Sequence, residues 1–396
     1  MINEQYKNML GGKSVIREFS EFAAARGKEI GYENVFDYSL GNPSVPVPDD
    51  YTKEMEELLK TKTSMELHGY SPSLGLPVFK ESVAASLNRR FGMNYTPEYI
   101  FPTSGAAGAL AHALRCVTKP GDEVLTFAPY FPEYGPYVNL TGAVLKVVPA
   151  DTESFQINFE KLTEMLNENT AAVLINTPNN PSGAVYSAET LEKLAKLLTE
   201  KQQEYGHEIF IISDEPYREI VFDGAELPYV SRFYANTLSC YSYSKSLSLP
   251  GERIGYVYVP QKATDGKALY SAVAGAARAG GHVCAPSLWQ KVIARCAHLR
   301  PDLASYDRNR KALYEGLTRM GYEMAKPDGA FYLFIKAPGG DANAFSDAAK
   351  KKDLLVVPGD GFGCPGYFRV CYCVSLEMIQ KSLPVFEELI QEFAEK

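Results

Sequence analysis

Histidine is scarce in this chain of 396 residues, and its cysteines follow no metal-binding pattern. The five histidines are scattered, and the seven cysteines include no C-x-x-C pair. Because structural zinc sites draw on closely spaced cysteines and histidines, we expect no metal site. An odd number of cysteines without paired spacing also gives no disulfide framework, so we expect reduced thiols, most of them buried.

Two further absences limit the possible partners. No stretch approaches the roughly 20 apolar residues that a membrane-spanning helix needs, and residues 1–10 have no apolar core of the signal-peptide type. Basic residues form no cluster, and the net charge is −8, from 40 basic and 48 acidic residues. The sequence therefore predicts a cytoplasmic protein that binds neither membranes nor nucleic acid.

What the chain does have is an alternation of short apolar runs and longer amphipathic stretches. Strands are predicted at residues 124–127, 171–175, 209–212, 238–241, 255–259, 331–335, 354–357 and 367–373. Helices are predicted at residues 106–117, 188–205, 266–278, 286–297, 304–320, 341–352 and 376–395, and one begins near Pro77. This alternation is typical of an α/β fold, and the chain length favours two lobes.

One lysine lies in an unusual setting. Lys245 follows the predicted strand 238–241 inside the stretch 242–255, which reads SYSKSLSLPGERIG, so we expect it in the loop just beyond a buried strand. A solvated surface lysine is the ordinary interpretation. Serines on both sides of it instead indicate a tight pocket, where an amine loses solvation, its pKa falls, and it can attack an aldehyde. Arg253, with hydroxyls and glycines nearby, fits a phosphate. A cofactor that carries both an aldehyde and a phosphate group is pyridoxal phosphate.

Polar residues follow several predicted strands at the same relative place. Asn180, Asp214 and Lys245 come soon after separate predicted strands, and Gly105 opens a predicted helix in a loop of small residues. In an open α/β sheet the carboxyl ends of the strands face one crevice, where ligands bind. The N-terminus of a helix binds phosphate through its backbone N–H groups. The sequence thus predicts that four regions converge on one pocket, although an aspartate at a strand end is often only a helix cap.

The pattern S-x-S-K-x5-G-x-R-x-G at residues 242–255 resembles the lysine-attachment signature of the class I/II aminotransferases, which are fold-type I pyridoxal phosphate enzymes. Residues 176–183, NTPNNPSG, are similar to a second hallmark of that family, with Ser182 in place of the usual threonine. Asp214 and Tyr217 match its Asp-x-x-Tyr pair.

The resemblance implies a large domain with a mostly parallel seven-stranded sheet between helices, plus a smaller α/β domain. We expect residues 1–45 to form an N-terminal arm and part of the small domain. Residues 46–300 would form the large cofactor-binding domain, and residues 301–396 the small C-terminal domain.

The resemblance also implies which residues bind the cofactor. Lys245 would attach it covalently and act as general base and acid, while Asp214 would bond its pyridine nitrogen. Tyr217 and Asn180 would bond its 3-oxygen. The other cofactor-binding residues implied are Gly105, Ala106, Ala107, Phe131, Ser242, Ser244, Arg253 and Tyr70.

Two aromatic residues of this set have a plain structural alternative. Phe131 would stack on the cofactor ring, and otherwise would pack in the core. Tyr70, five residues before Gly75, would reach the cofactor phosphate of a neighbouring subunit, and otherwise would be a core tyrosine. The first interpretation of Tyr70 implies a homodimer with shared active sites.

Substrate binding is implied for Gly41, Asn42, Asn180 and Arg369. Gly41 and Asn42 belong to a proline-rich loop, residues 40–48, which is equally typical of a linker. Arg369 is a charged residue within an apolar strand. A surface position at the edge of a sheet would also explain a charge there. The resemblance implies that its planar guanidinium grips the substrate α-carboxylate with two donors.

The activity implied is transamination between an α-amino acid and a 2-oxo acid, with aspartate and 2-oxoglutarate as one candidate pair. Aspartate needs a second cation for its distal carboxylate. One branch of the family has a lysine where this chain has Ala107, and Arg278 lies near the place of a partner-subunit arginine in another branch. The 26 tyrosines would equally suit aromatic or alkyl substrates.

Two other classes of protein share the fold. A pyridoxal phosphate-dependent β-lyase that cleaves C–S bonds is the alternative function, since it uses most of the same residues. A non-catalytic regulator is disfavoured, because Lys245 is intact and no DNA-binding domain fits in the residues before Gly41.

Overall fold

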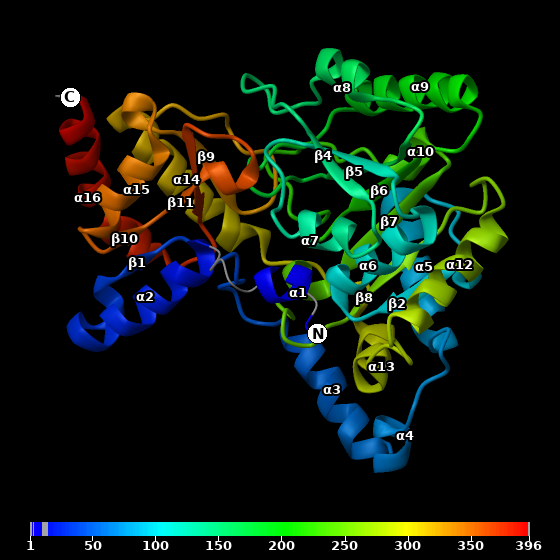
Figure 1. Ribbon diagram of the computed structural model, residues 1–396. Helices are drawn as coiled ribbons and strands as arrows, with labels where there is room; N and C mark the ends of the chain where they lie inside the picture. The colour runs from blue at the N-terminus through cyan, green and yellow to red at the C-terminus, as the bar shows by residue number, and fades with distance from the viewer. Residues whose placement is uncertain (1, 3, 10–14, 395–396) are drawn as a thin grey trace.

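A seven-stranded sheet runs through the larger part of the molecule (Figure 1). The computed structural model describes residues 2, 4–9 and 15–394. The strand order is β2-β8-β7-β6-β5-β3-β4, and β8 alone in this sheet runs antiparallel to its neighbours. The strands are β2 Ile100–Thr103, β3 Glu123–Phe127, β4 Val144–Val148, β5 Thr170–Asn176, β6 Phe210–Asp214, β7 Thr237–Ser242 and β8 Gly255–Tyr258. The predicted α/β fold with a mostly parallel sheet is confirmed.

The central strands bury both of their faces between two layers of helices. Leu174 and Ile212 pack with α6 (Gly105–Val117) and α12 (Gly266–Ala279). Val173 and Ile211 pack on the other face with α9 (Ala188–Tyr205), which Figure 1 shows on the opposite side of the sheet. Because successive strand residues point to opposite faces, a strand between two helix layers needs the continuous apolar run that the sequence has.

The remaining helices of this larger part cover its edges and ends. α5 begins with a proline at its first turn, as predicted, and packs with α13 through Phe79, Leu87 and Ile293. The helices are α3 Asp49–Thr61, α4 Ser64–His68, α5 Pro77–Phe91, α7 Tyr134–Asn139, α8 Phe159–Met165, α10 Val230–Phe233, α11 Tyr243–Ser246 and α13 Ser287–Cys296.

A smaller lobe is built around a three-stranded antiparallel sheet in the order β11-β12-β9. Its strands are β9 Tyr332–Lys336, β11 Val357–Pro358 and β12 Tyr367–Cys371, and its helices are α14 Leu303–Met320, α15 Ala342–Lys350 and α16 Leu376–Ala394. A parallel pair of two-residue strands, β1 Phe36–Asp37 and β10 Leu354–Leu355, joins the beginning of the chain to this lobe.

Helix α2 (Val15–Ile30) of the N-terminal arm packs on the smaller lobe of its own chain. The arm also contains α1 (Glu4–Met9), and Figure 1 shows α2 beside β1 and β10. Phe19 of α2 is buried with Leu355, and Arg26 Nε pairs with Asp353 Oδ1 at 2.8 Å. Among the described residues, every helix is too short or too polar to cross a bilayer.

Several local predictions differ from the structure. Lys245 lies in α11, a helix of one turn, and not in a loop, because four residues are too few to produce a helical periodicity in the sequence. The predicted strand 354–357 is split between β10 and β11, which join different sheets. β2 and β4 are both missing from the prediction. β4 is an edge strand whose apolar run is interrupted by Lys146 and whose residues are mostly not buried, and β2 has only four residues, one of them Pro102.

Candidate active site

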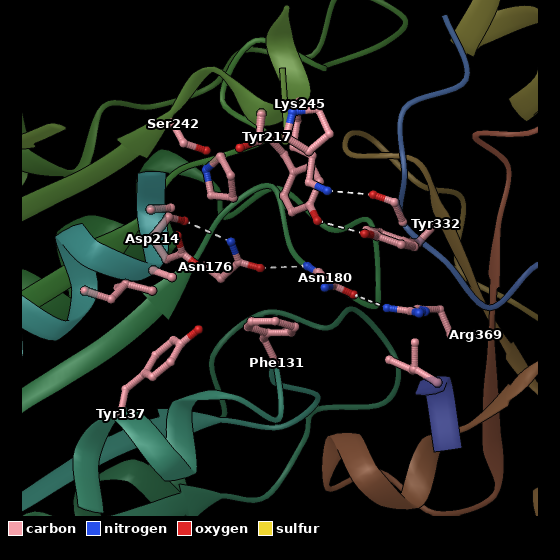
Figure 2. A pocket seen from close by; sticks show the side chains of 18 of the residues that line it. Phe131, Tyr137, Asn176, Asn180, Asp214, Tyr217, Ser242, Lys245, Tyr332 and Arg369 are labelled. Atoms are coloured by element: carbon pink, nitrogen blue, oxygen red, sulfur yellow. Dashed lines mark hydrogen bonds between the residues drawn. The ribbon is translucent and has the colours of Figure 1, made fainter. Parts of the chain in front are cut away.

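The carboxyl ends of β5, β6 and β7 open onto a cavity of about 370 Å³ (Figure 2). Asn176, Asp214 and Ser242 are the last residues of these strands, and all three line the cavity. The smaller lobe contributes Tyr332 and Arg369. Of the residues predicted from the sequence, the cavity is lined by Gly41, Ala106, Ala107, Phe131, Asn180, Asp214, Tyr217, Ser242, Ser244, Lys245, Arg253 and Arg369.

Lys245 extends from α11 towards the loop that contains Gly41. Its Nζ atom donates a hydrogen bond of 2.6 Å to the Gly41 carbonyl, and it lies 5.6 Å from the centre of the Phe331 ring. Burial lowers the pKa of this amine below its ordinary value. A buried amine without a carboxylate bonded to it deprotonates more readily, and it is then a nucleophile and a base.

Asp214 lies at the end of β6 with one oxygen paired and the other free. Its Oδ2 atom accepts a hydrogen bond of 2.8 Å from the Tyr134 hydroxyl. Its Oδ1 atom is buried and has no hydrogen-bond partner among the described residues. Burial raises the pKa of Asp214 to about 7. A ring N–H⁺ group that donated to Oδ1 would offset the cost of burying this carboxylate.

The start of α6 and the Arg253 loop form a corner suited to an anion. Ala106 and Ala107 line the cavity in the first turn of α6, where backbone N–H groups have no partner within the helix. The Arg253 guanidinium lies so close to Gly105 that a Cβ atom there would be 2.8 Å from Nη2. The Gly105 backbone in turn lies 3.0 Å from where a Cβ of Gly255 would be. The two glycines therefore allow the arginine loop to approach the helix start.

Aromatic side chains line the side of the cavity opposite Lys245. Figure 2 shows the rings of Phe131 and Tyr137 on one side and Tyr217 with Lys245 on the other. Phe131 follows β3 in a turn held to the smaller lobe by a 3.0 Å hydrogen bond from the Tyr130 N–H to the Phe362 carbonyl. A flat ring bound between these walls would have an aromatic face to pack against.

Asn180 and Arg369 meet across the two lobes. Arg369 is only 2% exposed, and its Nη1 atom donates a 2.9 Å hydrogen bond to Asn180 Oδ1, while Nη2 donates to the Ser39 carbonyl. Its Nε atom has no partner among the described residues. The predicted alternative of a surface arginine at a strand edge is therefore excluded. A buried guanidinium with an unused donor is suited to a carboxylate ligand.

The sequence alone does not single out two of the polar residues in the cavity. Tyr332 donates or accepts a 2.7 Å hydrogen bond with the Tyr217 hydroxyl, but it is the second residue of an apolar run, FYLFI, that reads as a core strand. Asn176 donates through Nδ2 to the Asp214 carbonyl and accepts from the Asn180 N–H. Its only sequence signal is its place as the first residue of the NTPNNPSG motif.

Four residues named from the sequence lie outside the cavity. Gly105 is next to it, at the start of α6, whereas Asn42 is exposed. Tyr70 is 89% exposed, so the predicted alternative of a core tyrosine is excluded. Arg278 is exposed beside a separate hollow that Ser73, Leu74 and Val283 also line.

The cavity fits pyridoxal phosphate group by group. The free Asp214 oxygen suits the ring nitrogen, the α6 corner with Arg253 suits the phosphate, and the Lys245 amine suits the aldehyde. No group of three or more histidine, cysteine, aspartate or glutamate side chains that could hold a metal ion occurs among the described residues.

Comparison with known proteins gives the same answer. The family profile described as aminotransferase class I and II matches residues 33–385. A probable aspartate/prephenate aminotransferase from Aquifex aeolicus is 31% identical over 391 residues, which cover 93% of this chain and 94% of that protein. An amino transferase from Eubacterium rectale, solved as a crystal structure, has a TM-score of 0.97 at 50% identity and covers 99% of both chains.

A more distant solved structure shares the arrangement. The aspartate aminotransferase from Thermotoga maritima has a TM-score of 0.87 at 27% identity, with 98% of this chain and 100% of that chain covered. The profile match spans most of the chain, and the cavity supplies a partner for each group of the cofactor. The chain therefore belongs to the class I and II aminotransferases, which transfer amino groups between amino acids and 2-oxo acids with pyridoxal phosphate.

Proposed function

We propose that this aminotransferase transfers the amino group of aspartate to 2-oxoglutarate and that it works as a homodimer with shared active sites. The observation that carries the proposal is that Lys245 and Arg369 line one cavity, with an amine whose pKa is lowered and a buried guanidinium that keeps a free donor. One residue can therefore move a proton while the other holds the substrate.

The charged residues of the cavity each have a defined task in this proposal. When bound, pyridoxal phosphate supplies an aldehyde that links to amines and a protonated ring that withdraws electrons from the substrate Cα. Asp214 keeps the ring nitrogen protonated through its free Oδ1 atom. The N–H groups at the start of α6 and the Arg253 guanidinium hold the phosphate.

Lys245 acts as the general base and acid of the reaction. Once the substrate amine has replaced it, its neutral Nζ atom accepts the proton from the substrate Cα and then delivers it as an acid. The lowered pKa supports this task, because an amine of ordinary pKa would stay protonated at neutral pH. The Gly41 carbonyl, 2.6 Å from Nζ, orients the amine.

The substrate carboxylates need two separate cations. Among the described residues that line the cavity, the cations are Lys245, Arg253 and Arg369, and only Arg369 is free of a cofactor task. Arg369 therefore holds the α-carboxylate. We assign the distal carboxylate of aspartate to Arg278 of the partner subunit, since the Arg278 side chain is exposed and lines a hollow with Ser73 and Leu74, three and four residues after Tyr70. Several of the relatives are named aspartate aminotransferases.

The dimer is supported by exposed apolar side chains in the chain segment of Tyr70 and beside it. Tyr70 is 89% exposed, Val78 54% and Leu74 46%, and Val283, 66% exposed, lines one hollow together with Leu74. Large exposed apolar side chains of this kind are typical of an interface. A cytoplasmic location belongs to the same proposal. It is supported by seven free cysteines, five of them buried, because thiols stay reduced in a reducing compartment.

The reaction is tested by counting product. Aspartate added without an oxo acid should give one equivalent of oxaloacetate per chain and then stop, and 2-oxoglutarate should restart turnover. A β-lyase would instead form no oxaloacetate from aspartate, and given a cysteine S-conjugate it would release a thiol, pyruvate and ammonia over many turnovers without an acceptor. That outcome, or no oxo acid from any amino acid, would overturn the proposal.

The aspartate preference is tested at Arg278. Arg278→Ala should raise KM for aspartate by about tenfold or more and leave KM for alanine nearly unchanged, since one charged hydrogen bond is worth about 1.5–3 kcal/mol. Arg308→Ala, which removes another exposed arginine, is the matched control. Equal rates of wild-type and Arg278→Ala protein on both amino acids would rule out this role of Arg278.

Shared sites are tested by mixing two impaired variants. Lys245→Ala should be inactive, and Tyr70→Ala should bind the cofactor weakly. In a mixed dimer, the Lys245 of one chain meets the Tyr70 of the other, so refolding the two variants together should restore up to about half of the activity of one wild-type dimer per mixed dimer. No recovery in a mixture shown to contain mixed dimers would contradict a shared site.

A further inference from the structure

The Tyr332 side chain contacts residues from three different parts of the active site. Its hydroxyl forms a 2.7 Å hydrogen bond with the Tyr217 hydroxyl, and its ring centre lies 4.8 Å from the Cζ atom of Arg369. A Cβ atom added at Gly41 would overlap the Tyr332 hydroxyl, so the Gly41 backbone lies directly against it. Gly41 is also the residue whose carbonyl accepts from Lys245.

These contacts follow from the register of the smaller sheet. Tyr332 on β9 is opposite Cys371 on β12, and Arg369 is two residues before Cys371. Residues two apart on a strand point to the same face, so Tyr332 and Arg369 are diagonal neighbours on one face. Figure 2 shows both side chains on the same side of the cavity, with Tyr332 directed at Tyr217. Tyr332 is 1% exposed, which fixes its ring in place.

Counting donors gives the direction of the hydrogen bond between the two tyrosines. A tyrosine hydroxyl has one hydrogen to donate and lone pairs to accept with. If Tyr217 donates its hydrogen to the cofactor 3-oxygen, it cannot also donate to Tyr332. The Tyr332 hydroxyl must then be the donor in the 2.7 Å bond. Donation to Tyr217 polarises its O–H bond and strengthens the bond that it makes onward.

We propose that Tyr332 is a positioning residue that acts through Tyr217 on the cofactor 3-oxygen and through its ring on Arg369. Its hydroxyl sets how strongly Tyr217 donates, and its ring holds the guanidinium that binds the substrate carboxylate. This inference rests on the proposed role of Tyr217.

The test uses the pH dependence of the visible absorption of the holoenzyme. Tyr332→Phe keeps the ring and removes the hydroxyl, so it weakens donation to the 3-oxygen and leaves the negative charge there less stabilised. The proton shared between this oxygen and the lysine-linked nitrogen is then held more tightly. The midpoint of the absorption change should move to higher pH by about half a unit to one unit, the size of one hydrogen bond. KM for the amino acid should change by less than about threefold, because the ring still holds Arg369.

Tyr372→Phe is the matched control. Tyr372 is fully buried in the same lobe and donates its hydroxyl hydrogen to the Ala330 carbonyl at 3.1 Å, but it does not line the cavity. This variant should leave the midpoint unchanged. A Tyr332→Phe midpoint equal to that of wild type and of Tyr372→Phe would overturn the proposal.

A double mutant separates action through Tyr217 from a general loss of structure. In a Tyr217→Phe background, adding Tyr332→Phe should shift the midpoint no further, whereas an independent role would give additive shifts. The dissociation constant of pyridoxal phosphate, titrated into the cofactor-free variants, should follow the same pattern. Failure of the proposed function is distinguishable, because it is scored by product formation from aspartate, whereas failure of this inference is scored by the absorption midpoint of the holoenzyme.

Discussion

Arg369 in the smaller lobe donates a 2.9 Å hydrogen bond to the Oδ1 atom of Asn180, which lies in the turn after β5 of the larger lobe (Figure 2). The residue proposed to hold the substrate carboxylate is thereby joined to the residue proposed to bind the cofactor 3-oxygen. A carboxylate bound to Arg369 would compete for the same guanidinium donors. In this proposal, substrate binding and the hydrogen bonding of the cofactor are linked through Asn180.

Replacing Arg369 with lysine should mainly impair substrate binding. A lysine ammonium has no planar fork, and it cannot serve Asn180, Ser39 and a carboxylate together in the geometry seen here. We expect KM for the amino acid to rise by about 10²-fold, as the loss of one buried charged contact implies. Cofactor affinity should change only a few-fold. Steady-state rates and a cofactor titration check this, and an unchanged KM would remove Arg369 from the substrate site.

Replacing Asp214 with asparagine should make the stability of the cofactor-free protein less dependent on pH. The pKa of Asp214 in the fold is about 7, above its ordinary value of 3.8. Between these values the native state binds more protons than the unfolded state, so the free energy of unfolding falls as pH rises. The loss is complete above pH 7 and amounts to about 4 kcal/mol. The asparagine amide of the variant cannot ionise and avoids this loss.

Urea unfolding of the two cofactor-free proteins checks the effect of Asp214→Asn. The variant should gain stability relative to wild type between pH 5 and pH 8, by up to about 3 kcal/mol, because part of the loss in wild type has already occurred at pH 5. A difference in unfolding free energy that is the same at both pH values would show that Asp214 does not ionise with a raised pKa.

Replacing Gly41 with alanine should disturb the lysine. The added Cβ would overlap the Tyr332 hydroxyl, so the loop must move and the 2.6 Å hydrogen bond from Lys245 to the Gly41 carbonyl is lost. We expect kcat/KM to fall by about tenfold or more, equivalent to about 1.4 kcal/mol of transition-state stabilisation.

Gly135→Ala is the control for Gly41→Ala, since a Cβ there would meet nothing within 4 Å. Steady-state rates and thermal unfolding should show wild-type behaviour for this control. Equal activity of the two variants would mean that the close approach of Gly41 to Tyr332 has no catalytic consequence.

The parts of the site that the sequence predicts are those next to strand ends. Asn180, Asp214 and Lys245 lie shortly after apolar runs that are strands, and the geometry of a parallel sheet brings such positions together. The sequence also predicts the helices 188–205 and 266–278, because their hydrophobic periodicity is long and regular.

The contacts that the sequence does not predict depend on pairing between distant segments. Tyr332 lies in an apolar strand, and only the register of β9 with β12 shows that it faces Arg369. The pairing of β1 with β10 joins residues more than 300 positions apart through two residues each. Such short strands carry no periodicity in the sequence. The position of the N-terminal arm is therefore seen only in the structure, from the packing of Phe19 and the ion pair of Arg26 with Asp353.

Proton transfer by the Lys245 amine is tested by the rate of oxo-acid formation by Lys245→Ala in a single turnover. The variant should still bind pyridoxal phosphate, because Asp214, Arg253 and the start of α6 remain. Its rate should fall by about 10²–10⁴-fold or more, the usual contribution of a general base. Lys80→Ala, which removes another lysine whose pKa burial lowers, should retain the wild-type rate. A wild-type rate in Lys245→Ala would mean that another group moves the proton.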